Sequence, residues 1–362
     1  MKRADELLPW KVTDISLRPF KDMWSFNPSL FYDGAFWRCV LRCADYCMLG
    51  GATLRSPKAK PGVSRTKNIM VIFDPMTWKP VEIYKMREQD DLPRTSSSSI
   101  GYEDIRLFRT DKYGLQGIAA ALHLQRTDRG KQLAEQVLLW FDDEYNIVEA
   151  LPIRGSTTAQ KNWVPFDHCA EPRFLHTIDS GLLFDEHGEL PASAASVQPS
   201  SRPRRTYLPD ASTIARAQER ANEAEHDRAR EERKRPNMRP VQPSAVDSEV
   251  PSYKGLRGGT QLIRIDDDSW LGIGHAMRFV DGLKVYWHVW YLVDSRGKLT
   301  AASPQMKLAP NNGIEFAAGM AIDGERVVVS FGVDDMESKI GETQLSAVIE
   351  TLSSIPTTIA SS

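Results

Sequence analysis

Two acidic residues and an arginine within four positions form a segment whose spacing suits acid–base chemistry. The segment reads Glu103-Asp104-Ile105-Arg106 and leads into an apolar run. Alternate side chains of a strand share a face, so Asp104 and Arg106 are expected on one side and Glu103 on the other. Arg106 could then hold Asp104 in place, although a close cation lowers the pKa of a carboxyl group and opposes an acid role. The alternative is an ordinary Asp–Arg pair that fixes a strand.

Segments rich in glycine and aromatic residues carry side chains that could bind phosphate or a sugar. Arginine grips phosphate through paired donors, and lysine acts as a point charge. The candidate binding residues are Asn27, Arg42, Arg106, Lys161, Asn162, Trp163, Arg257, His275 and Glu315. Arg257 precedes two glycines and could equally be a surface arginine at the entry of a strand. Trp163 could stack on a sugar ring, although a lone tryptophan is more often part of a core.

No pattern in the chain predicts a metal or a cofactor. Cys39, Cys43 and Cys47 are four residues apart and lack the second ligand pair that zinc sites prefer, so we expect buried thiols. The acidic run 266–268 is too short for a calcium loop and is interpreted as a turn. The sequence contains no Walker loop, no zinc-protease motif and no serine-hydrolase motif.

Short strands separated by turns account for most of the chain. Apolar, β-branched and aromatic runs recur, as at 69–73, 137–141 and 286–292, with Gly, Asp, Asn or Pro between them. Two types of tight turn alternate along the chain, which predicts an all-β fold, a five-bladed β-propeller of small antiparallel sheets. A double-sheet sandwich is the competing interpretation. In a propeller, the innermost strand of each blade would bring one polar segment to a shared central funnel.

The stretch 191–253 differs in composition from the rest of the chain. It is rich in Ala, Ser, Pro, Arg and Glu and has almost no large apolar residue. Without an apolar stripe it cannot dock onto a core, so we interpret it as a charged, partly helical or disordered insertion. A contact arm for an anionic partner is the alternative. The expected organisation is propeller blades over 1–190, the insertion over 191–253, and further blades that close the ring over 254–362.

Composition excludes several classes of protein. A formal net charge of −2 over 362 residues gives no field that would attract nucleic acid, and we expect none as a partner. Neither a signal peptide nor a run of about 20 apolar residues is visible, so no membrane span is expected. Four cysteines are too few for a disulfide framework, which favours a cytoplasmic location. The oligomeric state is not predicted.

The polar segments, taken in chain order, resemble those of a known group of enzymes. They are FNPS (26–29), YEDIR (102–106), KNWVPF (161–166), RGGTQLI (257–263), LGIGH (271–275), IEFAAGM (314–320) and VVVSFGVDD (327–335). This set resembles the five-bladed propellers of the inverting mannoside phosphorylases (glycoside hydrolase family 130), and more closely the related β-1,2-mannosyltransferases. The resemblance extends from about Trp24 to Ile349, and the stretch 191–253 is an addition to it.

The resemblance implies inverting transfer of a sugar, with mannose expected. Asp104 lies at the position of the proton donor, and an inverting enzyme needs one carboxylic acid for that role. Arg42, Lys161, Arg257 and His275 would surround phosphate or a sugar phosphate. Hydrolysis is less favoured, because hydrolytic relatives place acidic residues there. The expected partners are a carbohydrate and phosphate or a sugar phosphate. Two other hypotheses stay open: a catalytically inactive glycan-binding propeller, and an interaction platform.

Overall fold

The computed structural model of the chain describes residues 2–49, 52–90, 92, 99–126, 132–153, 162–178, 180–191, 197–198, 255–280, 283–310 and 313–355. Strands make up 58% of the structure and helices 4%, which confirms the predicted all-β class. Most of the stretch 191–253 and the candidate residue Lys161 lie outside the described residues. Within the described ranges, no helix combines the length and the apolar character needed to cross a membrane. The domain boundaries and the cytoplasmic location stay predictions.

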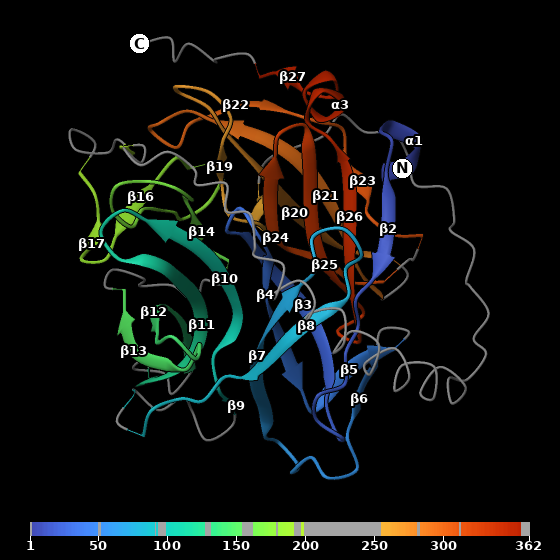
Figure 1. Ribbon diagram of the computed structural model, residues 1–362, viewed down its shortest axis with the longest axis vertical. Coiled ribbons are helices and arrows are strands. Elements are labelled where there is room, and N and C mark those ends of the chain that lie inside the picture. The colour runs from blue at the N-terminus through green and yellow to red at the C-terminus, as the bar shows by residue number, and fades with distance from the viewer. Residues whose placement is uncertain are drawn as a thin grey trace.

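Antiparallel sheets stand around a central axis in a β-propeller arrangement, as predicted (Figure 1). One blade contains β3 (Trp24–Tyr32), β4 (Trp37–Ala44), β7 (Ser64–Phe73) and β8 (Pro80–Lys85), with β9 (Ser99–Ile100) beside β7. A small hairpin follows β4, formed by β5 (Tyr46–Leu49) and β6 (Ala52–Arg55). The next blade contains β10 (Glu103–Thr110), β11 (Gly114–Arg126), β12 (Gln132–Phe141) and β13 (Ile147–Pro152).

Two further blades come from the last third of the chain. One is built on β20 (Trp270–Val280) and β21 (Leu283–Val293), with the shorter β18 (Arg257–Gly258), β19 (Ile263–Arg264), β22 (Leu299–Ala302) and β23 (Met306–Lys307). The other contains β24 (Glu315–Asp323), β25 (Arg326–Val333) and β26 (Glu337–Gln344). The inner strands β3, β10 and β24 contact one another at the axis.

The described part of the chain forms four blades, so the prediction of a five-bladed propeller is wrong. A small sheet lies between β13 and β18, and its strands have two or three residues: β14 (Val164–Pro165), β15 (Phe174–Leu175), β16 (Leu183–Asp185) and β17 (Gly188–Glu189). Pro165 and Pro172 limit the strand length, because proline lacks the amide hydrogen of a sheet ladder. The small sheet still packs on a neighbouring blade, with the rings of Phe108 and Phe174 5.6 Å apart.

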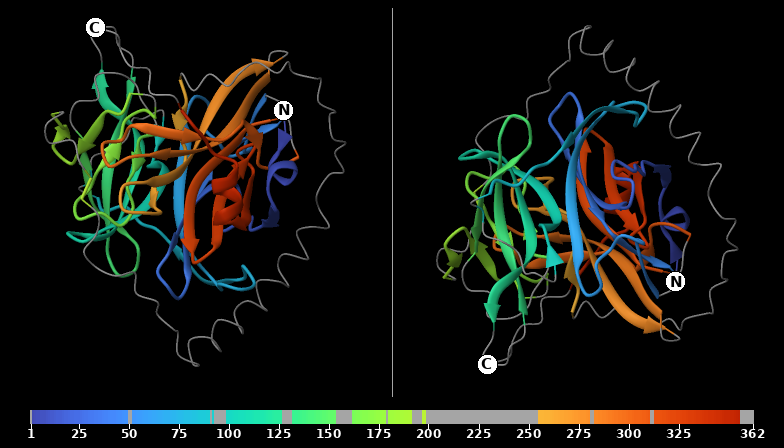
Figure 2. Two further views of the ribbon diagram at one scale, coloured as in Figure 1. Left: turned by 90° about the horizontal axis from the view of Figure 1, so that it is seen from above. Right: turned by 90° about the horizontal axis from the view of Figure 1, so that it is seen from below.

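The two ends of the chain close the ring. Near the N-terminus, β2 (Lys11–Asp14) pairs antiparallel with β26, and β1 (Lys2–Arg3) pairs parallel with β23. At the other end, β27 (Ser353–Ser354) pairs with β22. Two short helices of the described residues, α1 (Ala4–Leu7) and α3 (Leu345–Glu350), accompany these terminal strands. Figure 2 shows the blue N-terminal segment against the red last blade. Strand hydrogen bonds between distant parts of the chain therefore hold the ring closed.

Apolar side chains fill the interfaces between neighbouring sheets. Leu30 of the first blade and Val328 of the last belong to one buried cluster, together with Cys39 and Cys43. All four cysteines of the chain are buried free thiols, which confirms the prediction for Cys39, Cys43 and Cys47. Burial raises the pKa of the Cys43 thiol to about 12, so this residue packs as a small apolar group.

Buried polar side chains join the blades at the axis. The side-chain amide of Gln261, which lies between β18 and β19, donates to the carbonyl of Leu30 at 2.8 Å and to the carbonyl of Met320 at 2.5 Å. Its side-chain oxygen accepts the Met320 amide at 3.1 Å. One residue thus connects three blades.

Arg106 makes a second set of axial bonds. Its side chain is 1% exposed. Nε donates to the carbonyl of Gly259 at 2.6 Å, Nη1 to the carbonyl of Trp163 at 3.2 Å, and Nη2 to Oδ1 of Asn162 at 2.7 Å. Burial lowers the pKa of Arg106 to about 10, although the charge of Asp104 opposes this shift. The guanidinium therefore ties the second blade to the small sheet and to the β20–β21 blade.

We expect Arg106→Met to lower the free energy of unfolding by about 2–4 kcal/mol, because it leaves three buried acceptors without a donor. Arg109→Met is the matched control: it lies on the same strand with an exposed side chain and should change stability by about 0.5 kcal/mol or less. Urea unfolding of both variants measures the difference. Equal effects of the two substitutions would contradict the role given to Arg106.

Candidate active site

The N-terminal ends of the inner strands surround a cavity of about 860 Å³ at one end of the axis. Six of the predicted site residues lie in its wall: Asn27, Arg42, Asp104, Asn162, Arg257 and His275. The structure therefore brings together side chains that are up to about 250 positions apart in the sequence. Further wall residues that the sequence did not single out for the site include Tyr46, Lys284, Tyr286, Phe316 and Asp335.

Asp104 faces the cavity because its strand contains a bulge. In the pairing of β10 with β11, Glu103 lies opposite Ala120 and Arg106 lies opposite Ile118, which leaves one extra residue in β10. Asp104 adopts a φ of 53°, in the left-handed region that Asp and Asn tolerate better than most residues. The predicted alternation, with Glu103 turned away from Asp104, is wrong, since both residues line the cavity.

Asn27 reaches the cavity through a bulge of the same kind. One extra residue lies in β3 between Phe26 and Ser29, and Asn27 has a φ of 48°. Its Nδ2 donates to Oδ1 of Asp104 at 2.9 Å. Gly332 gives it room, because a Cβ at that glycine would lie 2.3 Å from Oδ1 of Asn27. Bulges in two neighbouring blades thus orient the candidate acid.

Arg42 is the cation that contacts the carboxylates. Its Nη1 lies 3.0 Å from Oδ1 of Asp104, and its Nη2 lies 3.1 Å from Oε1 of Glu103. It also donates to the hydroxyl of Tyr46 at 2.8 Å and to the hydroxyl of Thr66 at 3.2 Å. The side chain of Arg42 is 4% exposed, and that of Asp104 is 14% exposed. The donors of Arg42 are therefore directed at protein groups, and this residue positions Asp104.

Three predicted site residues lie outside the cavity wall. Arg106, which was expected to hold Asp104, donates to two backbone carbonyls and to Asn162, so Arg42 takes the expected role. Trp163 is fully buried in an apolar cluster. Glu315 is also fully buried, accepts two backbone amides at 2.9 Å, and has a pKa that burial raises to about 7. Arg106, Trp163 and Glu315 therefore hold the blades together instead of lining the cavity. The residues next to them in the sequence give no sign of this difference.

Positive charge and a neutral imidazole occupy another part of the wall. Arg257 is exposed and Lys284 is half-buried, and neither forms an ion pair with a carboxylate in the described ranges. His275 is buried, and its pKa is lowered to about 3 by burial and by the charges of Arg106 and Arg257. His275 is therefore neutral at pH 7. Its buried Nδ1 has no hydrogen-bond partner among the described residues.

Asp335 is a cavity residue that the sequence reasoning missed. It lies in the turn between β25 and β26 with a φ of 50°. Burial raises the pKa of Asp335 to about 6; the charge of Arg42 opposes the rise and that of Asp104 adds to it. The sequence does mark this position, because Asp334 and Asp335 directly follow the apolar strand β25. The end of β25 lies beside the start of β24, because Val333 pairs with Glu315.

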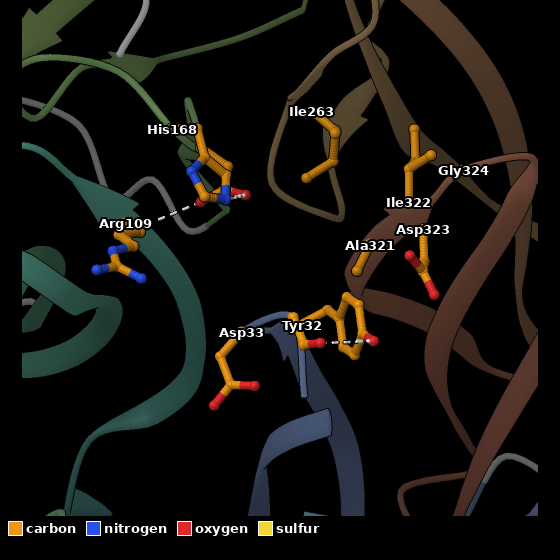
Figure 3. Close-up of a pocket in the computed structure, with 11 residues that line it drawn as sticks. Tyr32, Asp33, Arg109, His168, Ile263, Ala321, Ile322, Asp323 and Gly324 are labelled. Carbon is orange, nitrogen blue, oxygen red and sulfur yellow. Dashed lines mark hydrogen bonds and ion pairs between the residues drawn. The ribbon is translucent and has the colours of Figure 1, made fainter. Parts of the chain in front are cut away.

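A second cavity, of about 190 Å³, lies at the opposite ends of the inner strands. Figure 3 shows Tyr32, His168, Ile263 and Ala321 around it, with the guanidinium of Arg109 turned away from Tyr32. Its polar groups serve the local structure: the Tyr32 hydroxyl, for example, donates to the carbonyl of Gly34 at 3.1 Å. Nowhere in the described residues do three or more His, Cys, Asp or Glu side chains form a metal-binding group. The larger cavity is therefore the candidate site.

Comparison with solved structures shows the same fold in carbohydrate-active proteins. The β-1,2-mannobiose phosphorylase of Listeria innocua is 12% identical, with 94% of this chain and 96% of that chain covered and a TM-score of 0.50. A glycoside hydrolase candidate of Parabacteroides distasonis is 10% identical, with 91% and 97% covered and a TM-score of 0.52. No protein-family model and no curated protein matches the sequence. At this identity the likeness concerns the fold.

The raised pKa of Asp335 predicts a pH-dependent stability. The folded chain holds this proton more tightly than the unfolded chain, so Asp335 contributes stability that is lost as the pH rises from 3.8 to about 6. We expect Asp335→Asn to gain stability relative to the unsubstituted chain across this interval. Urea unfolding at several pH values measures the difference, and a carboxyl NMR titration checks the pKa directly. Parallel pH profiles for the two chains would contradict the prediction.

Proposed function

We propose that this chain is an inverting glycosyl-transferring enzyme that moves a mannosyl unit between a phosphorylated donor and a carbohydrate acceptor. The observation that carries the proposal is Asp104, which is partly buried and is oriented by Asn27 and Arg42, in the wall of a large cavity that also contains Arg257 and Lys284. A proton-transferring carboxyl group and cations for a phosphate are the two requirements of that reaction. The fold shared with the Listeria phosphorylase supports the class, and that protein's substrate suggests mannose.

In the transfer direction, Asp104 acts as the general base. Its carboxylate takes the proton of an acceptor hydroxyl, whose oxygen then forms a bond to C1 of the donor sugar while the bond from C1 to the phosphate oxygen breaks. The phosphate leaves with both electrons of that bond, and Arg257 and Lys284 stabilise its charge. In phosphorolysis the same atoms move in reverse, and Asp104 returns the proton to the leaving hydroxyl. Arg42 at 3.0 Å favours the carboxylate form that the transfer direction needs.

Attack on the face opposite the leaving group inverts the configuration at C1. A retaining enzyme would need a second carboxylate as nucleophile, about 5 Å from the acid. Glu103 and Asp335 also lie in the wall, so the anomeric form of the product is the decisive measurement. Hydrolysis is the less favoured reaction, because the cavity cations Arg257 and Lys284 suit a phosphate better than an activated water.

We expect Asp104→Asn to lower kcat/KM by about 100- to 10,000-fold in a chain that is less stable but still folded, because the amide cannot transfer the proton. The assay incubates the chain with α-mannose 1-phosphate and mannose and follows phosphate release and the anomeric NMR signal. Asp323→Asn, an exposed carboxylate beside the other cavity, is the control and should retain activity. Full activity of Asp104→Asn would contradict the assignment, and glycan binding without turnover would favour the inactive propeller.

We further expect Arg257→Met and Lys284→Met each to raise the KM for mannose 1-phosphate by about 10-fold or more, since each removes a charge-assisted bond. The control is Arg278→Met, which removes a cation from the other face of the same hairpin as Lys284. Steady-state kinetics with varied donor and fixed acceptor separate the effects. An effect on acceptor KM alone would place these cations at the acceptor and not at the phosphate.

A further inference from the structure

A small hairpin outside the blades brings a phenol hydroxyl group into the cavity. Tyr46 is the first residue of β5 and pairs with Arg55 of β6. Both Tyr46 and Met48, on the same strand, lie in the cavity wall. The amide of Met48 donates to the carbonyl of Asp334 at 2.8 Å, which ties the hairpin to the turn that carries Asp335. The last blade therefore helps to hold Tyr46 in place.

Two neighbouring side chains restrain the ring of Tyr46. The ring of Phe26 lies 6.0 Å away at an interplanar angle of 58°. The guanidinium carbon of Arg42 lies 5.7 Å from the centre of the Tyr46 ring. Tyr46 is half-buried between these contacts, so its hydroxyl group is positioned before a ligand enters the cavity.

Arg42 holds Tyr46 and Asp104 with the two terminal nitrogens of one guanidinium. Its Nη2 donates to the Tyr46 hydroxyl oxygen at 2.8 Å, and its Nη1 lies 3.0 Å from Oδ1 of Asp104. Arginine has donors only, so the Tyr46 oxygen is the acceptor in this bond and the hydroxyl hydrogen is directed elsewhere. Among the described residues, no group accepts that hydrogen.

The Tyr46 hydroxyl group keeps its proton at pH 7. Burial raises the pKa of Tyr46, the charge of Arg42 opposes the rise, and the charges of Asp335, Glu103 and Asp104 add to it. The bond from Arg42 also polarises the O–H group, because hydrogen bonds in a chain strengthen one another. The cavity therefore contains an oriented neutral donor beside the candidate acid, and an oxygen atom of a ligand is a suitable acceptor for it.

We propose that Tyr46 donates a hydrogen bond to one hydroxyl oxygen of the transferred sugar and makes the site specific for a sugar that carries this oxygen. The inference rests on the proposed function and adds a specificity-determining residue to it. One guanidinium holds Tyr46 beside Asp104, so the contacted oxygen lies close to the bond that Asp104 helps to form or break. A site built to bond a hydroxyl group rejects the analogue that lacks it, because the polar group of the site is then left without a partner.

The experiment combines Tyr46→Phe with donors that each lack one hydroxyl group, the 2-, 3-, 4- and 6-deoxy forms of α-mannose 1-phosphate. Tyr46→Phe should lower kcat/KM for mannose 1-phosphate by about 3- to 12-fold, the worth of one neutral hydrogen bond. With one of the deoxy donors the same substitution should change kcat/KM by less than about twofold, because the contact is already absent. An equal loss with every donor would overturn the proposal, since the hydroxyl group would then act only through Arg42.

Tyr32→Phe is the matched control. Tyr32 lies in the wall of the other cavity, where its hydroxyl group donates to the carbonyl of Gly34 at 3.1 Å, so its loss should leave kcat/KM unchanged with all donors.

Calorimetric titration with mannose and its deoxy forms tests the contact without turnover. In an inactive chain, weaker binding of mannose by Tyr46→Phe, with no such loss for one deoxymannose, would retain the contact and reject the proposed reaction. An active chain that Tyr46→Phe leaves unchanged in both kinetics and mannose binding would retain the reaction and reject the contact.

Discussion

The hydrogen bond between Asn27 and Asp104 is the contact on which the candidate site depends. It joins the innermost strands of two neighbouring blades at 2.9 Å, and both residues lie on left-handed backbone within a bulge. Side chains alternate with a period of two, so a strand without its bulge would send its polar residue to the other face. Each such backbone conformation costs about 1–3 kcal/mol and persists only where the surroundings enforce it. Gly332 is part of those surroundings, because its missing Cβ admits Asn27.

Burial decides how charge is distributed around this contact. Arg42 is almost fully buried and lies within 3.1 Å of both Glu103 and Asp104, so a desolvated cation is neutralised by carboxylates on the adjacent blade. Removing one partner of such a buried ion pair lowers the free energy of unfolding by about 3–5 kcal/mol. The network therefore stabilises the fold and also positions Asp104 for the proposed reaction. Asp335 is in the same cavity with its pKa raised to about 6 by burial. Carboxyl groups in unlike environments are the general means by which one site separates acid and base roles.

Closure of the ring makes the convergence possible. Pairing of β2 with β26 and the three-blade contact of Gln261 hold the inner strands at a fixed distance from the axis. Glycine at 258 allows a close approach, since a Cβ there would lie 2.2 Å from the carbonyl oxygen of Asn162. The same rigid frame extends outward through the β20–β21 hairpin, whose Lys284 and Tyr286 belong to the cavity wall.

Local patterns in the chain predicted the all-β class and the propeller arrangement, and together with the family resemblance they selected six of the residues that meet in the cavity. Apolar runs, tight turns and polar motifs are properties of neighbouring residues, and a sequence displays them directly. The direction of Asp104 was predicted wrongly because a bulge depends on the partner strand as well as on the bulged one. The small sheet and the cation beside Asp104 were also predicted wrongly, because both depend on contacts between distant segments. Arg106 was expected beside Asp104, and Arg42 lies there. Ion pairs, pKa shifts and the burial of Glu315 depend on distances between residues far apart in the chain, and those distances exist only once the ring has closed.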